Sequence, residues 1–403
     1  MLKADRTLLY SSSRGNFSIP MKLSILLFHL LASIIINFSF AILIHYLITN
    51  DSPDSTNQLL SYDPCVANRR MNMKQHTITW HVDDIKSSHE DTKVNDQFEK
   101  WLQKTYGEDG IGKVKSSRGK RHDYLAIILD FSTPGVLGLD MTDHVKRIIK
   151  DFEYELGEET QPWNDKLFRV DETSKRLDDE RSSVFHTFTM KLMFVSKQAR
   201  QDIQPGVAFL ATRTGCSTEQ DWNKLVRILS FLKKTQNQIM RLEADDTQTL
   251  KWYVDAAFAV HPDYKSHTGA ILTLGKGAVT SVSTKQKVNT RSSTESELVG
   301  VDDVVAKILW TKQFMEAQGF KVKLNIVYRD NTSSMKLEQN GKSSSGKRTR
   351  HFNNKYFYIT DLIKRNEMKI EYCPTDKMWA DYMTKPLMGS KFKSFWKWIM
   401  NSE

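Results

Sequence analysis

The second half of this 403-residue chain predicts an α/β (α+β) fold, a mixed five-stranded sheet with helices on its faces. Short apolar and β-branched runs bounded by turn residues follow residue 249, as is typical of strands. A long segment at 294–318 carries apolar residues at helical spacing. The predicted elements follow the order β-β-β-α-β-α-α-β-α. This order favours one sheet covered by helices, because each element needs a partner for its apolar face.

The first half predicts a series of shorter elements. Val94, Phe98 and Leu102 have helical spacing, and Thr218 with Asp221 gives a strong helix-start signal. Thr142 or Asp143 is expected to cap another helix. We expect a hairpin over 76–89, a helix over 92–106, a loop over 107–123, a buried strand over 124–131, a helix over 141–156, an irregular charged segment over 157–184, and helices over 187–199 and 218–235.

The elements of the second half give the predicted sheet its order. Gly319 is expected to end the long helix, and Pro386 follows the last one. A Gly-Lys-Gly turn separates the second strand from the third. We expect strands over 251–260, 268–275, 278–286, 324–330 and 368–373, and helices over 294–318, 351–364 and 375–384, with a short helix after residue 330.

The overall composition indicates a folded chain with a polyanionic partner. The hydrophobic share is 39%, and the net charge of +10 favours nucleic acid as the partner. Cys65, Cys216 and Cys373 lie far apart without a C-x-x-C spacing. This pattern argues against a disulfide framework and a structural zinc site, and it fits a reducing compartment.

Residues 23–48 break this soluble pattern. They contain no Asp, Glu, Lys or Arg, and about 20 apolar residues suffice to span a bilayer. Basic residues precede the segment and acidic residues follow it, so the positive-inside rule would place the N-terminus in the cytoplasm. We therefore treat residues 23–48 as a candidate transmembrane helix.

Three acidic residues of the second half occupy positions that suggest chemistry. Asp255 lies within an apolar strand, where a charge is costly unless it is neutralised. Asp330 ends another strand, at the edge of an open sheet where ligands collect. Asp381 lies in the predicted final helix.

A fourth acidic candidate lies in the segment 291–310, where either Glu295 or Glu297 qualifies. Glu297 shares a helix face with Val301, Val304 and Ile308, so it is expected to point toward the sheet. A competing interpretation makes Thr294 and Glu297 a capping box, in which Glu297 only holds the start of the helix. We favour the site, because the other three carboxylates call for a fourth.

Four converging carboxylates would repel one another unless cations neutralise them. Two Mg²⁺ ions about 4 Å apart would do so, with Mn²⁺ as a substitute, and would activate water for phosphodiester cleavage. The competing interpretation is a set of unrelated surface acids. That interpretation does not explain Asp255, whose strand is otherwise apolar.

Several motifs closely resemble the ribonuclease H (RNase H) domain of Ty1/copia-type retrotransposon polyproteins. They are "YVDAAFAV", "STKQKVNTRSSTESELVGV", "VYRDNTSSM", "KRTRHFNNKYF" and "EYCPTDKMWADYMTKPL", and the resemblance covers residues 249–390. It implies an RNase H fold and an endonuclease, a hydrolase that cuts the RNA strand of an RNA–DNA hybrid. It assigns metal ligation to Asp255, Glu297, Asp330 and Asp381. The family commonly has Tyr where this chain has Leu298.

The basic stretch 342–351 gains a role from the resemblance. Its side chains could hold backbone phosphates, which is the sequence-independent part of nucleic-acid binding. The alternative is a solvated basic loop, and for His351 a packing role at a helix start. The candidate nucleic-acid ligands are Lys342, Lys347, Arg348, Arg350 and His351.

Asp83 and Asp84 stand at the tip of the predicted hairpin "TITWHVDDIKSSH". As residues alone they fit either a polar turn or a Mg²⁺ site. The surrounding segment 62–89 resembles the palm of the same family's reverse transcriptase, an RNA-directed DNA polymerase, and the resemblance makes both residues candidate catalytic aspartates. The further aspartate on an earlier strand and most of the fingers have no counterpart upstream, so we expect a truncated, inactive polymerase.

The resemblance divides the chain into five regions. These are an unrelated N-terminal region at 1–58, the end of the palm and the thumb at 59–165, a connection at 166–248, the RNase H domain at 249–390 and a tail at 391–403.

Three functions compete on this evidence. The first is an active RNase H from a retrotransposon polyprotein, with an RNA–DNA hybrid and other polyprotein chains as partners. Its location would be a cytoplasmic virus-like particle or the nucleus. The second is a non-catalytic nucleic-acid-binding relic, and the third is a membrane-anchored protein.

Overall fold

The computed structural model describes residues 63, 65–81, 84–107, 114–246, 248–341 and 357–402, with the backbone alone at 2–4, 58–59 and Tyr106. The chain forms two compact units, residues 1–125 and 126–403. None of the helices in these ranges is both long and apolar enough to cross a bilayer. The candidate span at 23–48 lies outside the described residues.

The first unit is built on an antiparallel sheet with the strand order β2-β3-β4-β5-β1-β6. Helix α2 (Thr92–Tyr106) begins at Asp91, whose side chain accepts a hydrogen bond from the backbone N–H of Lys93. Phe98 and Leu102 of α2 share a core with Ile78 and Trp80 of the sheet. The strands are β1 (Leu2–Ala4), β2 (Gln58–Leu59), β3 (Val66–Met71), β4 (Lys74–His81), β5 (Asp84–Ser88) and β6 (Val114–Ser116), followed by β7 (Arg121–Tyr124).

Two predictions for this unit are confirmed and one is wrong. Strands β4 and β5 pair as the expected antiparallel hairpin, with His81 opposite Asp84. Helix α2 has the predicted bounds. The expected loop at 107–123 contains β6 and β7, because its many Lys, Arg and Gly residues concealed two short, mostly exposed strands.

The second unit begins with strands β8 (Ile127–Asp130) and β9 (Val136–Asp140), which pair antiparallel. Strand β9 also pairs with β10 (Met240–Ala244), and β10 with β13 (Gly275–Lys276). Between β9 and β10 lie the helices α3 (Thr142–Asp151), α4 (Asp179–Gln198), η2 (Gln201–Ile203), α5 (Gln204–Ala211) and α6 (Glu219–Lys234).

The helix predictions here hold best where a cap is strong. Helix α6 begins at Thr218 with the predicted capping box to Asp221. Helix α4 begins eight residues earlier than expected, inside the segment predicted to be irregular. Helix α3 stops at Asp151 rather than 156, and neither Thr142 nor Asp143 caps it, because the carboxylate of Asp140 accepts the Thr142 N–H at 2.9 Å.

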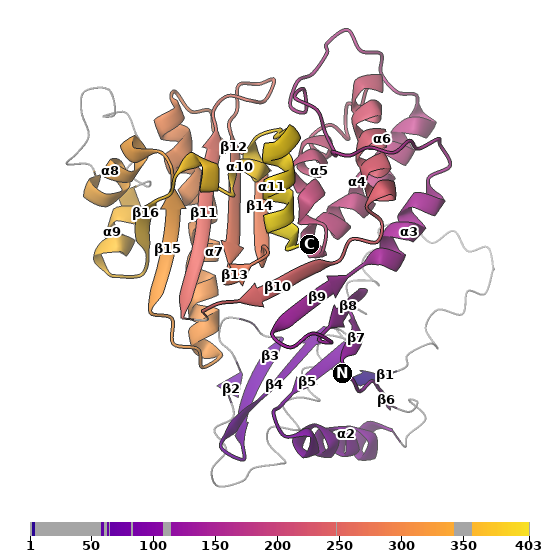
Figure 1. Cartoon of the computed structure of the whole chain (residues 1–403), viewed down its shortest axis with the longest axis vertical. Helices are drawn as coiled ribbons and strands as arrows, with labels where there is room; N and C mark the ends of the chain where they lie inside the picture. Colours follow the sequence, from indigo (N-terminus) through magenta and orange to yellow (C-terminus); the bar gives the residue numbers. More distant parts are fainter. Residues whose placement is uncertain are drawn as a thin grey trace, which may run out of the picture. The chain divides into compact units, whose positions relative to one another are not determined.

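The predicted mixed sheet forms the centre of the second unit, in the strand order β14-β12-β11-β15-β16 (Figure 1). Strand β11 pairs antiparallel with β12 and parallel with β15, and β15 is parallel to β16. This is the mixed five-stranded sheet that the sequence predicts. Its strands are β11 (Thr249–Ala257), β12 (His267–Thr273), β14 (Thr280–Lys285), β15 (Leu324–Arg329) and β16 (Lys369–Tyr372).

The two faces of this sheet have different covers. Leu250, Trp252 and Val254 of β11 pack against α7 (Ser293–Ala317) and α9 (Tyr358–Lys364). On the other face Ile271 joins a large core with α5, α10 (Asp381–Thr384) and α11 (Gly389–Met400). Alternate residues of β11 and β12 therefore enter separate cores, as the period of a strand requires.

The end of the chain differs from its predicted elements. The expected helix at 375–384 is broken into η5 (Thr375–Lys377) and α10, so Asp381 begins a helix instead of lying inside one. The expected tail at 391–403 contains most of α11, whose Phe392 and Phe395 are buried. Helix α8 (Thr332–Asn340) is the expected short helix after β15.

Candidate metal centre

Two parallel strands bring the first two acidic residues to one edge of the sheet. Asp255 lies near the end of β11, and Asp330 directly follows β15. The strands are parallel, with Tyr253 opposite Tyr328, so both carboxylates lie where the strands end. This is the edge at which open α/β sheets bind ligands.

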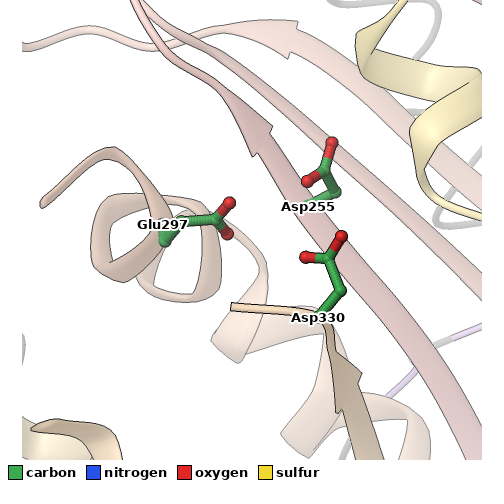
Figure 2. Close-up of side chains that lie close together, drawn as sticks. All are labelled: Asp255, Glu297 and Asp330. Carbon is green, nitrogen blue, oxygen red and sulfur yellow. The ribbon is translucent and has the colours of Figure 1, made fainter. Parts of the chain in front are cut away.

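The third acidic residue, Glu297, comes from the first turns of α7. One carboxylate oxygen each from Asp255, Glu297 and Asp330 lies within 4.8 Å of the others. Figure 2 shows the three carboxylates pointing toward one another from two strand ends and a helix. Asp255 is 2% exposed and Glu297 is 5% exposed, so two of the three acids are buried.

The start of α7 decides between the two interpretations of Glu297. The helix is capped by Ser292, whose hydroxyl accepts the Glu295 N–H at 3.1 Å. Glu295 in turn accepts the Arg291 N–H at 2.7 Å. Ser292 and Glu295 therefore hold the start of the helix, and the proposed box of Thr294 with Glu297 is wrong.

A glycine allows α7 to approach the sheet closely enough to deliver Glu297. A Cβ atom built on Gly300 would lie 3.3 Å from the Cβ of Ala256, which neighbours Asp255. A larger side chain at either position would move the helix away from β11. The small pair Gly300 and Ala256 therefore sets the depth of the acidic cluster.

The fourth predicted acid, Asp381, is not one of these three clustered ligands. It is 1% exposed, and it forms ion pairs with Lys385 at 2.6 Å and Lys391 at 2.9 Å. Lys385 also lies 3.4 Å from Asp255. Asp381 is therefore connected to the cluster through the ammonium group of Lys385.

A second glycine positions α10 over Asp255. Gly269 of β12 lies opposite Asp255 in the sheet. A Cβ atom on Gly269 would lie 2.5 Å from the Thr384 side chain and 3.0 Å from the Ala380 carbonyl oxygen. The close approach lets the Thr384 hydroxyl donate a hydrogen bond to Asp255.

Arg329 supplies a buried positive charge behind the cluster. Its guanidinium donates to Glu297 Oε2 at 2.6 Å and to the Val254 carbonyl at 3.0 Å. Glu338 of α8 lies 3.5 Å from the same guanidinium nitrogen of Arg329, and both side chains are fully buried. Arg329 thus fixes one oxygen of Glu297 and is itself held between two carboxylates.

Burial dominates the electrostatics of these acids. It raises the pKa of Glu297 to about 8, against the lowering effect of Arg329 and with a further increase from Asp255. Burial likewise raises the pKa of Asp255, which Lys385 lowers and Asp381 raises again. Without a bound cation these carboxylates are costly as anions, which is the condition under which metal binding is favourable.

The donor set fits the divalent cations that the family resemblance implies. Carboxylate oxygens are hard ligands suited to Mg²⁺ and Mn²⁺, and three of them already converge within 4.8 Å. Asp255, Glu297 and Asp330 are the residues that would hold the first cation. Asp381 would contribute to a second.

Residues that the sequence did not single out complete the centre. They are Arg329, Glu338, Thr384, Lys385 and Lys391. Arg329 and Lys385 lie within the quoted motifs "VYRDNTSSM" and "EYCPTDKMWADYMTKPL", so the motifs located them without revealing their contacts. A charged residue directly beside Asp330 was the available signal for Arg329.

The other predicted site residues are only partly described. Asp84 begins β5, and Asp83 lies outside the described residues. Their assignment to a polymerase site stays a prediction. The basic residues Lys342, Lys347, Arg348, Arg350 and His351 also lie outside the described residues.

Comparison with known proteins identifies relatives along most of the chain. No family model matches the chain. A Pol polyprotein from transposon TNT 1-94 of Nicotiana tabacum is 24% identical over 82% of this chain and 25% of its own length. The Ty1-LR3 Gag-Pol polyprotein of Saccharomyces cerevisiae is 23% identical over 81% of this chain and 19% of its own length.

The chain is a relative of the Ty1/copia-type Pol polyproteins. A Pol polyprotein from transposon RE1 of Arabidopsis thaliana is 30% identical over 49% of this chain, and the match covers 13% of the RE1 protein. The present chain therefore matches a quarter or less of the length of each of these three polyproteins.

A solved structure of prototype foamy virus protease–reverse transcriptase also matches. The two chains are 15% identical, and the match covers 78% of the present chain with a TM-score of 0.24. A score this low does not establish a shared arrangement of the whole chain.

Proposed function

We propose that the present chain is an RNase H, a hydrolase that cuts the RNA strand of RNA–DNA hybrids. The observation that carries the proposal is the convergence of Asp255, Glu297 and Asp330 at one edge of a mixed sheet. The resemblance of residues 249–390 to the family's RNase H domain supports it. Relatives named Pol polyproteins support the retrotransposon context.

In the proposed mechanism the chain's own residues build and orient the site. Asp255, Glu297, Asp330 and Asp381 hold two Mg²⁺ ions, for which Mn²⁺ can substitute. When bound, the cations activate water and neutralise the charge that develops on the phosphate. Arg329 holds Glu297 in place through its 2.6 Å ion pair, and Thr384 holds Asp255.

The nucleic acid would be held mainly through its phosphates. The basic residues of 342–351 are proposed to contact the backbone, in line with the net charge of +10. Such contacts carry little sequence preference. Asp83 and Asp84 are proposed as the metal-binding aspartates of a polymerase palm, with other polyprotein chains as partners and a virus-like particle or the nucleus as the location.

The test is hydrolysis of a labelled RNA–DNA hybrid by the full chain in Mg²⁺. Asp255→Asn removes one charge from the cluster at nearly constant volume, and we expect the rate to fall by about a hundredfold or more. Asp361→Asn is the matched control, because Asp361 is a half-exposed acid in the same unit that forms an ion pair with Arg365, one helical turn away. The control should retain the wild-type rate.

Two outcomes contradict the proposal. Unchanged cleavage by Asp255→Asn would show that the cutting comes from elsewhere. Salt-sensitive binding of the hybrid without cleavage by the wild-type chain would favour a nucleic-acid-binding relic.

A further inference from the structure

Lys385 lies between the two carboxylates that a second cation would need. Its ammonium nitrogen is 2.6 Å from Asp381 Oδ1 and 3.4 Å from Asp255 Oδ2. Asp381 and Asp255 are 1% and 2% exposed at their side chains. A buried pair of acids thus shares one lysine, and the lysine fills the space between them.

Lys391 makes a different contact with the same group. It pairs with the other oxygen of Asp381, Oδ2, at 2.9 Å. The two lysines are similarly exposed, at 38% and 41%. Lys391 therefore neutralises one oxygen of Asp381, whereas Lys385 contacts the other oxygen and also reaches Asp255.

The charges of this network favour one divalent cation in the free protein. The ion pairs join the cluster to Asp381 and Glu338, which makes five carboxylates, and to the three basic residues Arg329, Lys385 and Lys391. A bound cation favours the ionised form of each carboxylate, and two negative charges then remain on the protein. One divalent cation balances them, and a second would meet like charge at Lys385.

We propose that Lys385 occupies the place of a second divalent cation, so that the free chain binds one cation at Asp255, Glu297 and Asp330. A second cation then enters only when the Lys385 ammonium moves away from Asp255 and Asp381. Lys385 is a positioning residue that sets the number of cations bound before the substrate. This inference rests on the proposed metal centre.

The experiment counts Mn²⁺ bound to the full-length chain by electron paramagnetic resonance and isothermal titration, without nucleic acid. The wild-type chain should bind one Mn²⁺ at this centre. Lys385→Met should bind a second, with an affinity for the second ion at least about tenfold higher than in the wild type. Lys385→Gln is a second neutral variant, and near-ultraviolet circular dichroism checks that both fold.

Two controls separate position from net charge. Lys391→Met removes one positive charge beside Asp381 but leaves Lys385 between Asp381 and Asp255, so this variant should still bind one Mn²⁺. Lys385→Arg keeps the charge and should also bind one.

The outcomes distinguish this inference from the proposed function. If Asp255→Asn binds Mn²⁺ as the wild type does, the metal centre itself is wrong. If the wild type binds one ion but the neutral Lys385 variants gain nothing, or if Lys391→Met gains as much, the inference is overturned. Two ions that the free wild-type chain binds and that Asp255→Asn loses also overturn it, because both then lie at this centre.

Discussion

At the scale of single residues, the buried charge beside the acidic cluster has its partners built in. Arg329 and Glu338 are fully buried, and Arg329 reaches both Glu338 and Glu297. A buried charge without its partner costs several kcal/mol. The acidic cluster therefore depends on the contact of Arg329 with Glu297, and sequence position alone did not reveal that contact.

A second buried polar group is a chain of two histidines. His267 Nε2 lies 2.7 Å from Ser283 Oγ, which donates to the Met383 carbonyl. His267 must therefore donate at Nε2 and accept at Nδ1, where His261 Nε2 lies at 2.9 Å. His267 is neutral in this arrangement, because its Nδ1 accepts the N–H of His261 and carries no proton of its own.

The histidine chain predicts a loss of stability in acid. Burial lowers the pKa of His267 to about 3 and that of His261 to about 4. The unfolded chain takes up protons below about pH 6.5 while the folded chain does not, so stability is present above that pH and is lost as the pH falls. Between pH 7 and pH 5 we expect His267 alone to lower the free energy of unfolding by about 2 kcal/mol.

Urea denaturation at the two pH values measures this effect. In His267→Gln the loss between pH 7 and pH 5 should shrink by about 2 kcal/mol. His186→Gln, at an exposed position of α4, should keep the wild-type loss. An equal loss in wild type and His267→Gln would show that His267 is not held neutral.

At the scale of elements, local sequence signals located some helices and strands, whereas others depend on tertiary contacts. Periodicity with a cap located α2 and α6, and it placed α7 within a residue or two. It missed β9 and α5, because β9 contains glycine and α5 begins with Gln-Pro-Gly, and tertiary packing stabilises both. The break in the helix predicted at 375–384 was also missed.

The site shows the same division. Strand ends and helix faces predicted that Asp255, Glu297 and Asp330 would be neighbours, and the structure brings them together. The ion pairs of Lys385 and Arg329 were not predicted. They depend on how α10 and α8 dock on the sheet, and no local pattern encodes that docking.

The docking of α10 depends on the missing side chain of Gly269. In Gly269→Ala the new methyl group would lie 2.5 Å from Thr384 Cγ2 and 2.8 Å from Met383 Cβ, so α10 must move. We expect the free energy of unfolding to fall by about 1–3 kcal/mol, the usual cost of overpacking. Chemical denaturation measures it.

Gly157→Ala is the matched control for this substitution. A Cβ atom on Gly157 meets nothing within 4 Å, so the change should be within about 0.5 kcal/mol. If the two variants were equally stable, the contact between α10 and β12 would not be tight.

At the scale of the whole molecule, the mixed sheet shares its core with the helices that precede it. Phe209 and Phe231 of α5 and α6 belong to one core with Ile271, Phe392 and Phe395. Polar contacts follow the same boundary. The Tyr382 hydroxyl donates to the Asp202 carbonyl at 2.9 Å, and Trp163 Nε1 donates to the Leu387 carbonyl at 3.2 Å.

This shared core predicts that residues 249–403 do not form a stable unit without the helices. Cutting at 249 would expose Ile271, Phe392 and Phe395 and leave the partners of Gln201 and Asp202 unpaired. Residues 126–403, which form one compact unit, should unfold in one cooperative thermal transition. Residues 249–403 should bind the dye ANS and unfold gradually, because a surface that is normally buried stays exposed.

Near-ultraviolet circular dichroism during heating, with ANS fluorescence at 25 °C, compares the two pieces. A sharp transition without dye binding for residues 249–403 would contradict the prediction, since the sheet would then carry a sufficient core of its own. The expected result means that the acidic cluster needs the helices α4 to α6 indirectly. They support α10 and α11, and α10 carries Asp381 and is followed directly by Lys385.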